Sequence, residues 1–173
     1  MPKALLPVAG EPIVFRQLHL LQRYGVKRVV VLAGHLADAL REKIEPAAAR
    51  LGLELHVLVE SEPLGTCGGL HAARGLLGKE HFLFFCGDIA VEMDLERLIE
   101  VHMESAAAAT VSIAFSKVSP LPAAVVAMRR LRSAGPMNSP SMPAIEAISS
   151  ALATACGVST WVSTKVSWLA SVL

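Results

Sequence analysis

Three groups of residues in this 173-residue chain have types and spacings that are suited to chemistry. The segment E-S-E-P-L-G-T-C-G-G, from Glu60 to Gly69, combines two carboxylates with three glycines. The segment F-C-G-D ends in Asp88, and P-K-A-L-L-P-V-A-G-E-P near the start of the sequence contains Lys3. Carboxylates accept hydrogen bonds and bind hard metal ions, and glycines leave main-chain amides uncovered. Such a set can hold a flat, charged ligand.

The glycine-rich segment has two interpretations. Gly65, Gly68 and Gly69 leave the backbone without side chains, so that a base or ribose can lie against main-chain amides. Alternatively, the segment is a plain turn before a helix, with Thr66 as the N-cap. The complete E-x-E-P-L-G-T-x-G-G string is more specific than its glycines alone and favours nucleotide binding at Glu60, Gly65, Thr66 and Gly68.

The hydrophobic periodicity alternates between strands and helices. It predicts an α/β fold with a three-layer, mostly parallel Rossmann-like sheet and helices on both faces, because parallel strands need crossover connections. Ligands in such folds gather at the carboxyl ends of the strands, where both the Glu60 and the Asp88 segments begin. The predicted helices are Glu11–Tyr24, Asp38–Leu51, Gly69–Leu77 and Asp94–Ser105, and the predicted strands are Val26–Ala33, Leu53–Val59, Phe82–Cys86 and Thr110–Phe115.

The three strings together resemble those of the sugar-1-phosphate nucleotidyltransferase family, in particular its mannose-1-phosphate and heptose-1-phosphate guanylyltransferases. The resemblance covers residues 2–117 and implies transfer of a nucleotidyl group to a sugar 1-phosphate with release of pyrophosphate. It also implies a first strand in the middle of the sheet with a glycine-rich phosphate loop, and a later E-K-P segment, none of which this sequence contains. Two inner strands then lack a partner unless another segment pairs with them.

The resemblance implies that Glu60 faces the edge of the nucleotide base. A carboxylate only accepts hydrogen bonds, and guanine presents adjacent N–H donors on its pairing edge. Uracil and thymine present one donor between two carbonyls, and the oxygens of these carbonyls are repelled by a carboxylate. We therefore expect GTP to be preferred over UTP or dTTP.

The resemblance further implies that Asp88 is the first ligand of a Mg²⁺ ion and that Lys3 is catalytic. Magnesium often takes only one or two carboxylates, besides phosphates and waters. Attack of a sugar phosphate on the α-phosphorus brings two anions together, and a lysine offsets their repulsion. The alternatives are a turn aspartate and an ordinary solvated lysine.

Two parts of the chain differ in composition. Of its 15 acidic residues, 14 lie at or before Glu104, and Ser, Ala and Pro accumulate afterwards. We expect residues 1–117 to form a partial nucleotidyltransferase domain and residues 118–173 to be a divergent, poorly ordered segment. Little fixed structure is expected over Val118–Pro143, where five prolines interrupt regular elements, whereas Ala144–Leu173 is compatible with a helix and a short strand.

The overall composition excludes several classes of function. A net charge of +1 without a basic stripe gives no footprint for nucleic acid, and three cysteines without C-x-x-C spacing suggest neither disulfides nor zinc. The six histidines are scattered and are interpreted as surface or packing residues. No apolar run reaches the ~20 residues that span a bilayer, and the N-terminus does not resemble a secretory signal. The expected location is cytoplasmic, without a membrane partner and with an oligomer possible.

Two functions remain open from the sequence. The first is a Mg²⁺-dependent transferase that uses GTP and a sugar 1-phosphate. The second is a non-catalytic, nucleotidyltransferase-like regulatory or assembly subunit. Retention of Glu60, Gly65, Thr66 and Asp88 favours the first, whereas absence of the phosphate loop favours the second. The sugar is not identified by the sequence.

Overall fold

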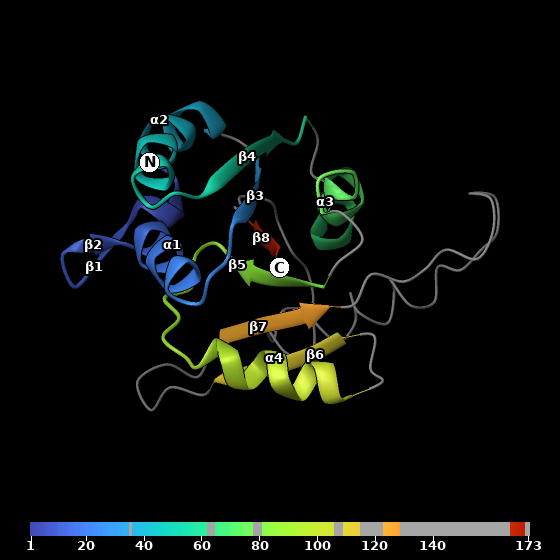
Figure 1. Cartoon of the computed structure of the whole chain (residues 1–173). Helices are drawn as coiled ribbons and strands as arrows, with labels where there is room; N and C mark the ends of the chain where they lie inside the picture. Colours follow the sequence, from blue (N-terminus) through green and yellow to red (C-terminus); the bar gives the residue numbers. More distant parts are fainter. Residues whose placement is uncertain are drawn as a thin grey trace, which may run out of the picture.

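The computed structural model describes residues 1–34, 36–61, 65–77, 81–105, 109–114, 123–128 and 167–171. These residues form an α/β fold (Figure 1). Its helices are the 3₁₀ turn η1 (Lys3–Leu5), α1 (Ile13–Arg23), α2 (Ala37–Arg50), α3 (Gly65–Ala73) and α4 (Leu95–Glu104). Its strands are β1 (Pro7–Val8), β2 (Glu11–Pro12), β3 (Arg28–Ala33), β4 (Glu54–Val59), β5 (Phe82–Cys86), β6 (Ala109–Ala114), β7 (Ala123–Met128) and β8 (Ser167–Ser171).

The main sheet has six strands in the order β4-β3-β8-β5-β7-β6. Strands β3 and β4 pair in parallel, whereas β8 is antiparallel to both of its neighbours, β3 and β5. Strand β7 is antiparallel to β5 and β6. The expected α/β class is confirmed, but the expectation of mostly parallel pairing is not. The reason is that β7 and β8, which come from beyond residue 117, run against the strands beside them.

Strand β8 lies between β3 and β5, the place where we expected from the sequence that two inner strands would lack a partner. Its residues Ser167–Ser171 hydrogen-bond with β3 on one side and β5 on the other, so β8 lies in the middle of the sheet. Unpaired buried amides cost about 1–3 kcal/mol each, and β8 removes that cost from the two inner edges. Strand β7 lies within Val118–Pro143, where the prolines led us to expect little fixed structure. The expected helix in Ala144–Leu173 lies outside the described residues.

Alternate side chains of the buried strands enter two separate hydrophobic cores, as the two-residue period of a strand requires. Helices α1 and α2 pack on one face with Val29 and Val31, and α3 lies on the other face over Val30 and Leu32 (Figure 1). The first core also contains Leu83, Phe85, Leu95 and Leu98, and the second contains Ala73, Leu77, Phe82 and Phe84. Helices therefore cover both faces of the sheet.

The predicted elements agree with the structure except at the glycine-rich segment. The strand Phe82–Cys86 has the predicted bounds, and the other predicted strands and helices before residue 115 differ by a few residues. The short elements η1, β1 and β2 were not predicted. The helix predicted at Gly69–Leu77 instead spans Gly65–Ala73, so that Thr66 lies inside it and is not its N-cap. The error came from the glycines, which disfavour helix interiors but are tolerated when burial against a sheet fixes the helix.

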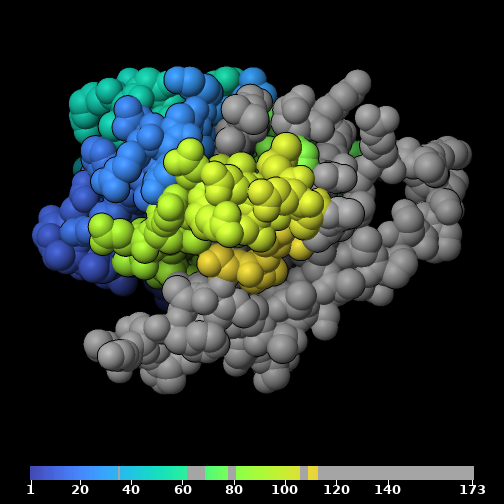
Figure 2. Space-filling view, turned by 60° about the horizontal axis from the view of Figure 1, so that its bottom comes forward, coloured from blue at the N-terminus to red at the C-terminus, as the bar shows by residue number. Residues whose placement is uncertain are grey.

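A buried histidine of helix α4 joins this helix to the start of β5 and to β6. His102 is 2% exposed; its Nδ1 shares a hydrogen bond with Thr110 Oγ1 (2.9 Å), and its Nε2 shares one with His81 Nδ1 (3.0 Å). This agrees with the interpretation of the histidines as packing residues. The outer side of α4 carries charged residues and faces solvent beside the N-terminal elements (Figure 2).

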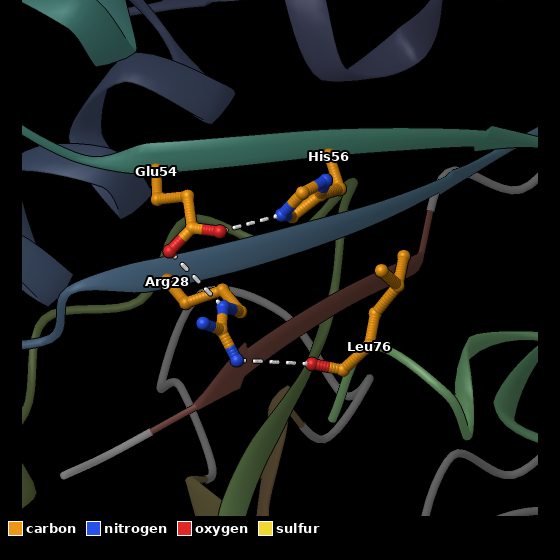
Figure 3. A network of polar contacts seen from close by, with 4 residues as sticks. All are labelled: Arg28, Glu54, His56 and Leu76. Carbon is orange, nitrogen blue, oxygen red and sulfur yellow. Dashed lines mark hydrogen bonds and ion pairs between the residues drawn. The ribbon is translucent and has the colours of Figure 1, made fainter. Parts of the chain in front are cut away.

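A polar network joins the amino ends of β3 and β4. Glu54 accepts hydrogen bonds from Arg28 Nε (3.1 Å) and His56 Nε2 (2.9 Å), and Arg28 also donates to the Leu76 carbonyl (3.4 Å; Figure 3). The hydrogen bond from His56, followed by that from Arg28, holds the pKa of Glu54 below its usual value. Both strands point away from this network toward the edge that carries the candidate site.

Candidate nucleotide and metal site

The carboxyl ends of β3, β4 and β5 lie at one edge of the sheet. Strands β3 and β4 are parallel and in register, with Ala33 opposite Val59. Strand β5 runs in the same direction as β3, because both are antiparallel to the strand between them. Glu60 directly follows β4, and Asp88 lies two residues after β5. The structure thus brings these two predicted residues to a common edge.

The register of β8 sets the lateral distance between the two positions. Ser167 pairs with Leu32 on one side and with Cys86 on the other, so β3 and β5 end at the same level. Three strand spacings separate β4 from β5, which corresponds to about 14 Å at the usual spacing between strands. Glu60 and Asp88 are therefore suited to contact different parts of one extended ligand rather than the same atom.

Glu60 is held between the sheet and α3. Its N–H donates to the Ala33 carbonyl (2.9 Å), which continues the β3–β4 pairing by one residue. A Cβ built on Gly69 would lie 2.5 Å from Glu60 Oε1 and 2.7 Å from Leu32 Cδ1, so a glycine is needed for this carboxylate to lie where it does. Burial raises the pKa of Glu60. A carboxylate in this state gains most from a partner that donates hydrogen bonds to it.

The other predicted nucleotide-binding residues, Gly65, Thr66 and Gly68, form the first turn of α3. The first four N–H groups of a helix have no acceptor within the helix. The expected role of main-chain amides is therefore compatible with a helical first turn in place of a loop. Residues 62–64, between Glu60 and this turn, lie outside the described residues.

Asp88 lies in a tight turn directly after β5. The Ile89 N–H donates to the Cys86 carbonyl at 3.4 Å, which closes the turn. Asp88 is half-buried, and among the described residues its carboxylate has no hydrogen-bond or ion-pair partner. No group of three or more His, Cys, Asp or Glu side chains in the described part of the chain is arranged to hold a metal. A single carboxylate still fits Mg²⁺, which completes its shell with phosphate oxygens and water.

One buried residue beside Asp88 was missed by the sequence analysis. Gln17, on α1, is 1% exposed, and its side-chain amide donates to the carbonyls of Cys86 (2.9 Å) and Ile89 (2.7 Å). These carbonyls flank the turn that carries Asp88. The available signal was a glutamine between Val14, Leu18 and Leu21, on the apolar side of an amphipathic helix.

Lys3 is exposed at the start of η1. The next residue, Ala4, is fully buried and packs in the core that α1 shares. An antiparallel hairpin follows, in which β1 and β2 are joined by Ala9 and Gly10, both with positive φ, and Pro12 then precedes α1. Helix α1 thus contacts the Lys3 turn and also, through Gln17, the Asp88 turn.

Comparison with known sequences assigns the chain to a family. Residues 1–123 match the family described as Nucleotidyl transferase, and the chain therefore belongs to that family. This confirms the resemblance noted in the sequence, and the family's relatives include guanylyltransferases. Among the described helices, none is long and apolar enough to cross a membrane.

Similar curated proteins are subunits of mannose-1-phosphate guanylyltransferase. The catalytic subunit beta of Xenopus tropicalis is 31% identical over 104 residues, which cover 59% of this chain and 29% of the relative. The corresponding subunit of Danio rerio is 27% identical over 115 residues, covering 65% of this chain and 32% of the relative. The aligned part thus spans about a third of the length of these relatives.

A solved structure with a similar fold is that of HddC from Yersinia pseudotuberculosis, complexed with GMP-PN. The TM-score is 0.55 at 16% sequence identity, over 75% of this chain and 68% of HddC. At this identity, the similarity supports the fold.

Proposed function

We propose that this chain binds GTP with Mg²⁺ at the carboxyl edge of its sheet and takes part in guanylyl transfer to a sugar 1-phosphate. The family match and the guanylyltransferases among the relatives support the reaction class. The single observation that carries the proposal is the shared edge of Glu60 and Asp88, each at the end of one of two strands that run in the same direction.

Glu60 is proposed to select the base. Its carboxylate supplies two acceptors and no donor, which complements the adjacent N–H groups of guanine. Its carboxylate lies against Gly69, and partial burial strengthens each hydrogen bond that it accepts. The first turn of α3, with Gly65, Thr66 and Gly68, is proposed to offer main-chain amides to the same nucleotide.

Asp88 and Lys3 are proposed to act at the phosphates. Asp88 would hold Mg²⁺, which supplies charge neutralisation at the α- and β-phosphates when it is bound. A phosphate oxygen of the sugar 1-phosphate forms a bond to the α-phosphorus, and the bond from that phosphorus to the β-phosphate bridging oxygen breaks. Pyrophosphate leaves with the electron pair, and no general base is required. Lys3 would offset the repulsion between the two anions before they react.

Binding and turnover of the full chain test the proposal together. Calorimetric titration with GTP, ATP and UTP in the presence of Mg²⁺ should give the tightest binding for GTP, because only guanine offers paired donors to Glu60. Pyrophosphate release from GTP should then require a sugar phosphate such as mannose 1-phosphate. Preference for UTP over GTP would contradict the base assignment. Selective GTP binding without pyrophosphate release from any sugar phosphate would support the non-catalytic function instead.

A further inference from the structure

Gln17 has a buried side-chain amide, and both of its hydrogen bonds are made to the short turn that carries Asp88. Its side chain is 1% exposed, and glutamine is seldom buried to this extent without hydrogen bonds. Nε2 carries two N–H donors, and each of its acceptors is a main-chain carbonyl, one on Cys86 and one on Ile89. The two acceptors lie 69 and 72 residues further along the chain, so these bonds connect α1 to the end of β5.

The geometry of these contacts shows what Gln17 constrains. The turn's own hydrogen bond, from the Ile89 N–H to the Cys86 carbonyl, is long at 3.4 Å, whereas the two bonds from Gln17 measure 2.9 and 2.7 Å. Shorter hydrogen bonds of good geometry restrain their partners more strongly. Gln17 therefore holds the backbone on both sides of Gly87 and Asp88.

A second observation concerns the side-chain oxygen of the same amide, Gln17 Oε1. Gln17 Oε1 is buried and has no hydrogen-bond partner in the described part of the chain. An unsatisfied buried acceptor is unfavourable, and an apolar side chain of similar size would avoid that cost if α1 and β5 only needed to pack together. The amide is therefore better explained by its two donors and by the turn that they hold.

We infer that Gln17 is a positioning residue that fixes the direction of the Asp88 carboxylate for Mg²⁺. This inference rests on the proposed function, in which Asp88 is the metal ligand. The residue acts through the backbone and does not touch the metal or the nucleotide. Its loss should weaken Mg²⁺-dependent binding while leaving recognition of the base intact, since Glu60 follows a different strand, β4, and lies against Gly69.

The test compares Gln17→Met with Leu21→Ala in the full chain. Methionine has a similar length and no donor, and Leu21 is a buried residue of the same helix whose apolar side chain cannot hydrogen-bond to the turn. GTP binding is titrated against Mg²⁺ concentration. We expect Gln17→Met to raise the Mg²⁺ midpoint about tenfold, as loss of a residue that orients a metal ligand typically does. GTP affinity without Mg²⁺ should not change, and Leu21→Ala should keep the wild-type midpoint.

The outcomes separate the inference from the proposed function. If the wild-type chain binds GTP with a Mg²⁺ dependence that Asp88→Asn removes, but Gln17→Met keeps the wild-type midpoint, the inference about Gln17 is wrong and the proposed function stands. If the wild-type chain shows no Mg²⁺ dependence, both fall. Should Gln17→Met fail to fold, Gln17→Asn retains the amide one methylene short, and an unchanged midpoint in that variant would equally overturn the inference.

Discussion

The carboxylate of Glu60 lies directly against the main chain of Gly69, so closely that a Cβ at residue 69 would come within 2.5 Å of Oε1. The contact joins the residue after β4 to the middle of α3, across a gap of nine positions in sequence. It explains why the glycine-rich string extends into a helix, where glycine is otherwise unfavourable by about 1 kcal/mol relative to alanine. The last glycine of the string is needed for the position of a side chain rather than for a turn.

Substitution of Gly69 should therefore alter nucleotide recognition. In Gly69→Ala, the added methyl group must displace Glu60 or Leu32, whose side-chain ends lie within 2.7 Å of it. If the charge-assisted hydrogen bonds to guanine are lost, GTP affinity should fall about 10- to 100-fold, which corresponds to about 1.5–3 kcal/mol. Titration with GTP measures this. Gly75→Ala is the matched control, because nothing lies within 4 Å of a Cβ there. Equal affinity in the two variants would contradict the role of this contact.

The raised pKa of Glu60 predicts a pH-dependent stability with a defined sign. Since burial favours the protonated form, the folded state binds more protons than the unfolded state between the ordinary value of 4.5 and the raised pKa. The free energy of unfolding should consequently fall as pH rises through that window. Glu60→Gln should remove this fall, and urea titrations at several pH values measure it. An unchanged pH dependence in Glu60→Gln would show that the carboxylate is not desolvated.

Glu54, at the other end of the same strand, provides the opposite sign and a control. Its pKa is lowered, first by the hydrogen bond from His56 and then by that from Arg28, so its stabilising contribution is present above pH 4.5 and is lost as pH falls through the lowered pKa. Glu54→Gln should flatten the acid side of the stability profile. It should leave the preference for GTP over UTP unchanged, whereas Glu60→Gln should reduce it. Loss of GTP preference in Glu54→Gln would indicate that the nucleotide does not bind at the carboxyl edge.

Strand β8 is predicted to be essential for the stability of the sheet. Leu169 pairs with Val30 of β3 and with Phe84 of β5, so its N–H donates within the sheet. Leu169→Pro removes that donor in the middle of a strand, and each buried group left unpaired costs about 1–3 kcal/mol. Chemical denaturation should show a loss of at least this size. Leu169→Ala retains the N–H and separates the hydrogen bond from the side chain. Equal stability of the proline and alanine variants would contradict the pairing of β8.

The local elements could be predicted from the sequence because their periodicities are intrinsic to each segment. The run Phe82–Cys86 is compact, apolar and bounded by His81 and Gly87, and its bounds were predicted without error. The pairing of β8 could not be predicted, since its partners lie more than 80 residues away along the chain and nothing in S-W-L-A-S specifies them. The mostly parallel sheet was predicted because β7 and β8 were not recognised as strands of it.

Only part of the candidate site could be predicted from the sequence. Glu60 and Asp88 could be predicted to share an edge because each follows a strand, and the directions of β4 and β5 bear this out. Gln17 could not be found in the same way: its place on the apolar side of α1 indicates burial, but the sequence does not show that its partner is a turn 69 to 72 residues further along the chain. The start of α3 at Gly65 was also missed, because glycines lower the helix propensity of this segment.

Titration of GTP against Mg²⁺ for Asp88→Asn tests the central claim most directly. Asn lacks the charge that a magnesium ligand needs, so the increase in GTP affinity that Mg²⁺ produces in the wild-type chain should be lost, while affinity without Mg²⁺ is retained. Asp94→Asn is the matched control, because Asp94 caps α4 by accepting from the Arg97 N–H (3.2 Å) and asparagine can do the same. It should behave as wild type. A wild-type response to Mg²⁺ in Asp88→Asn would contradict the account.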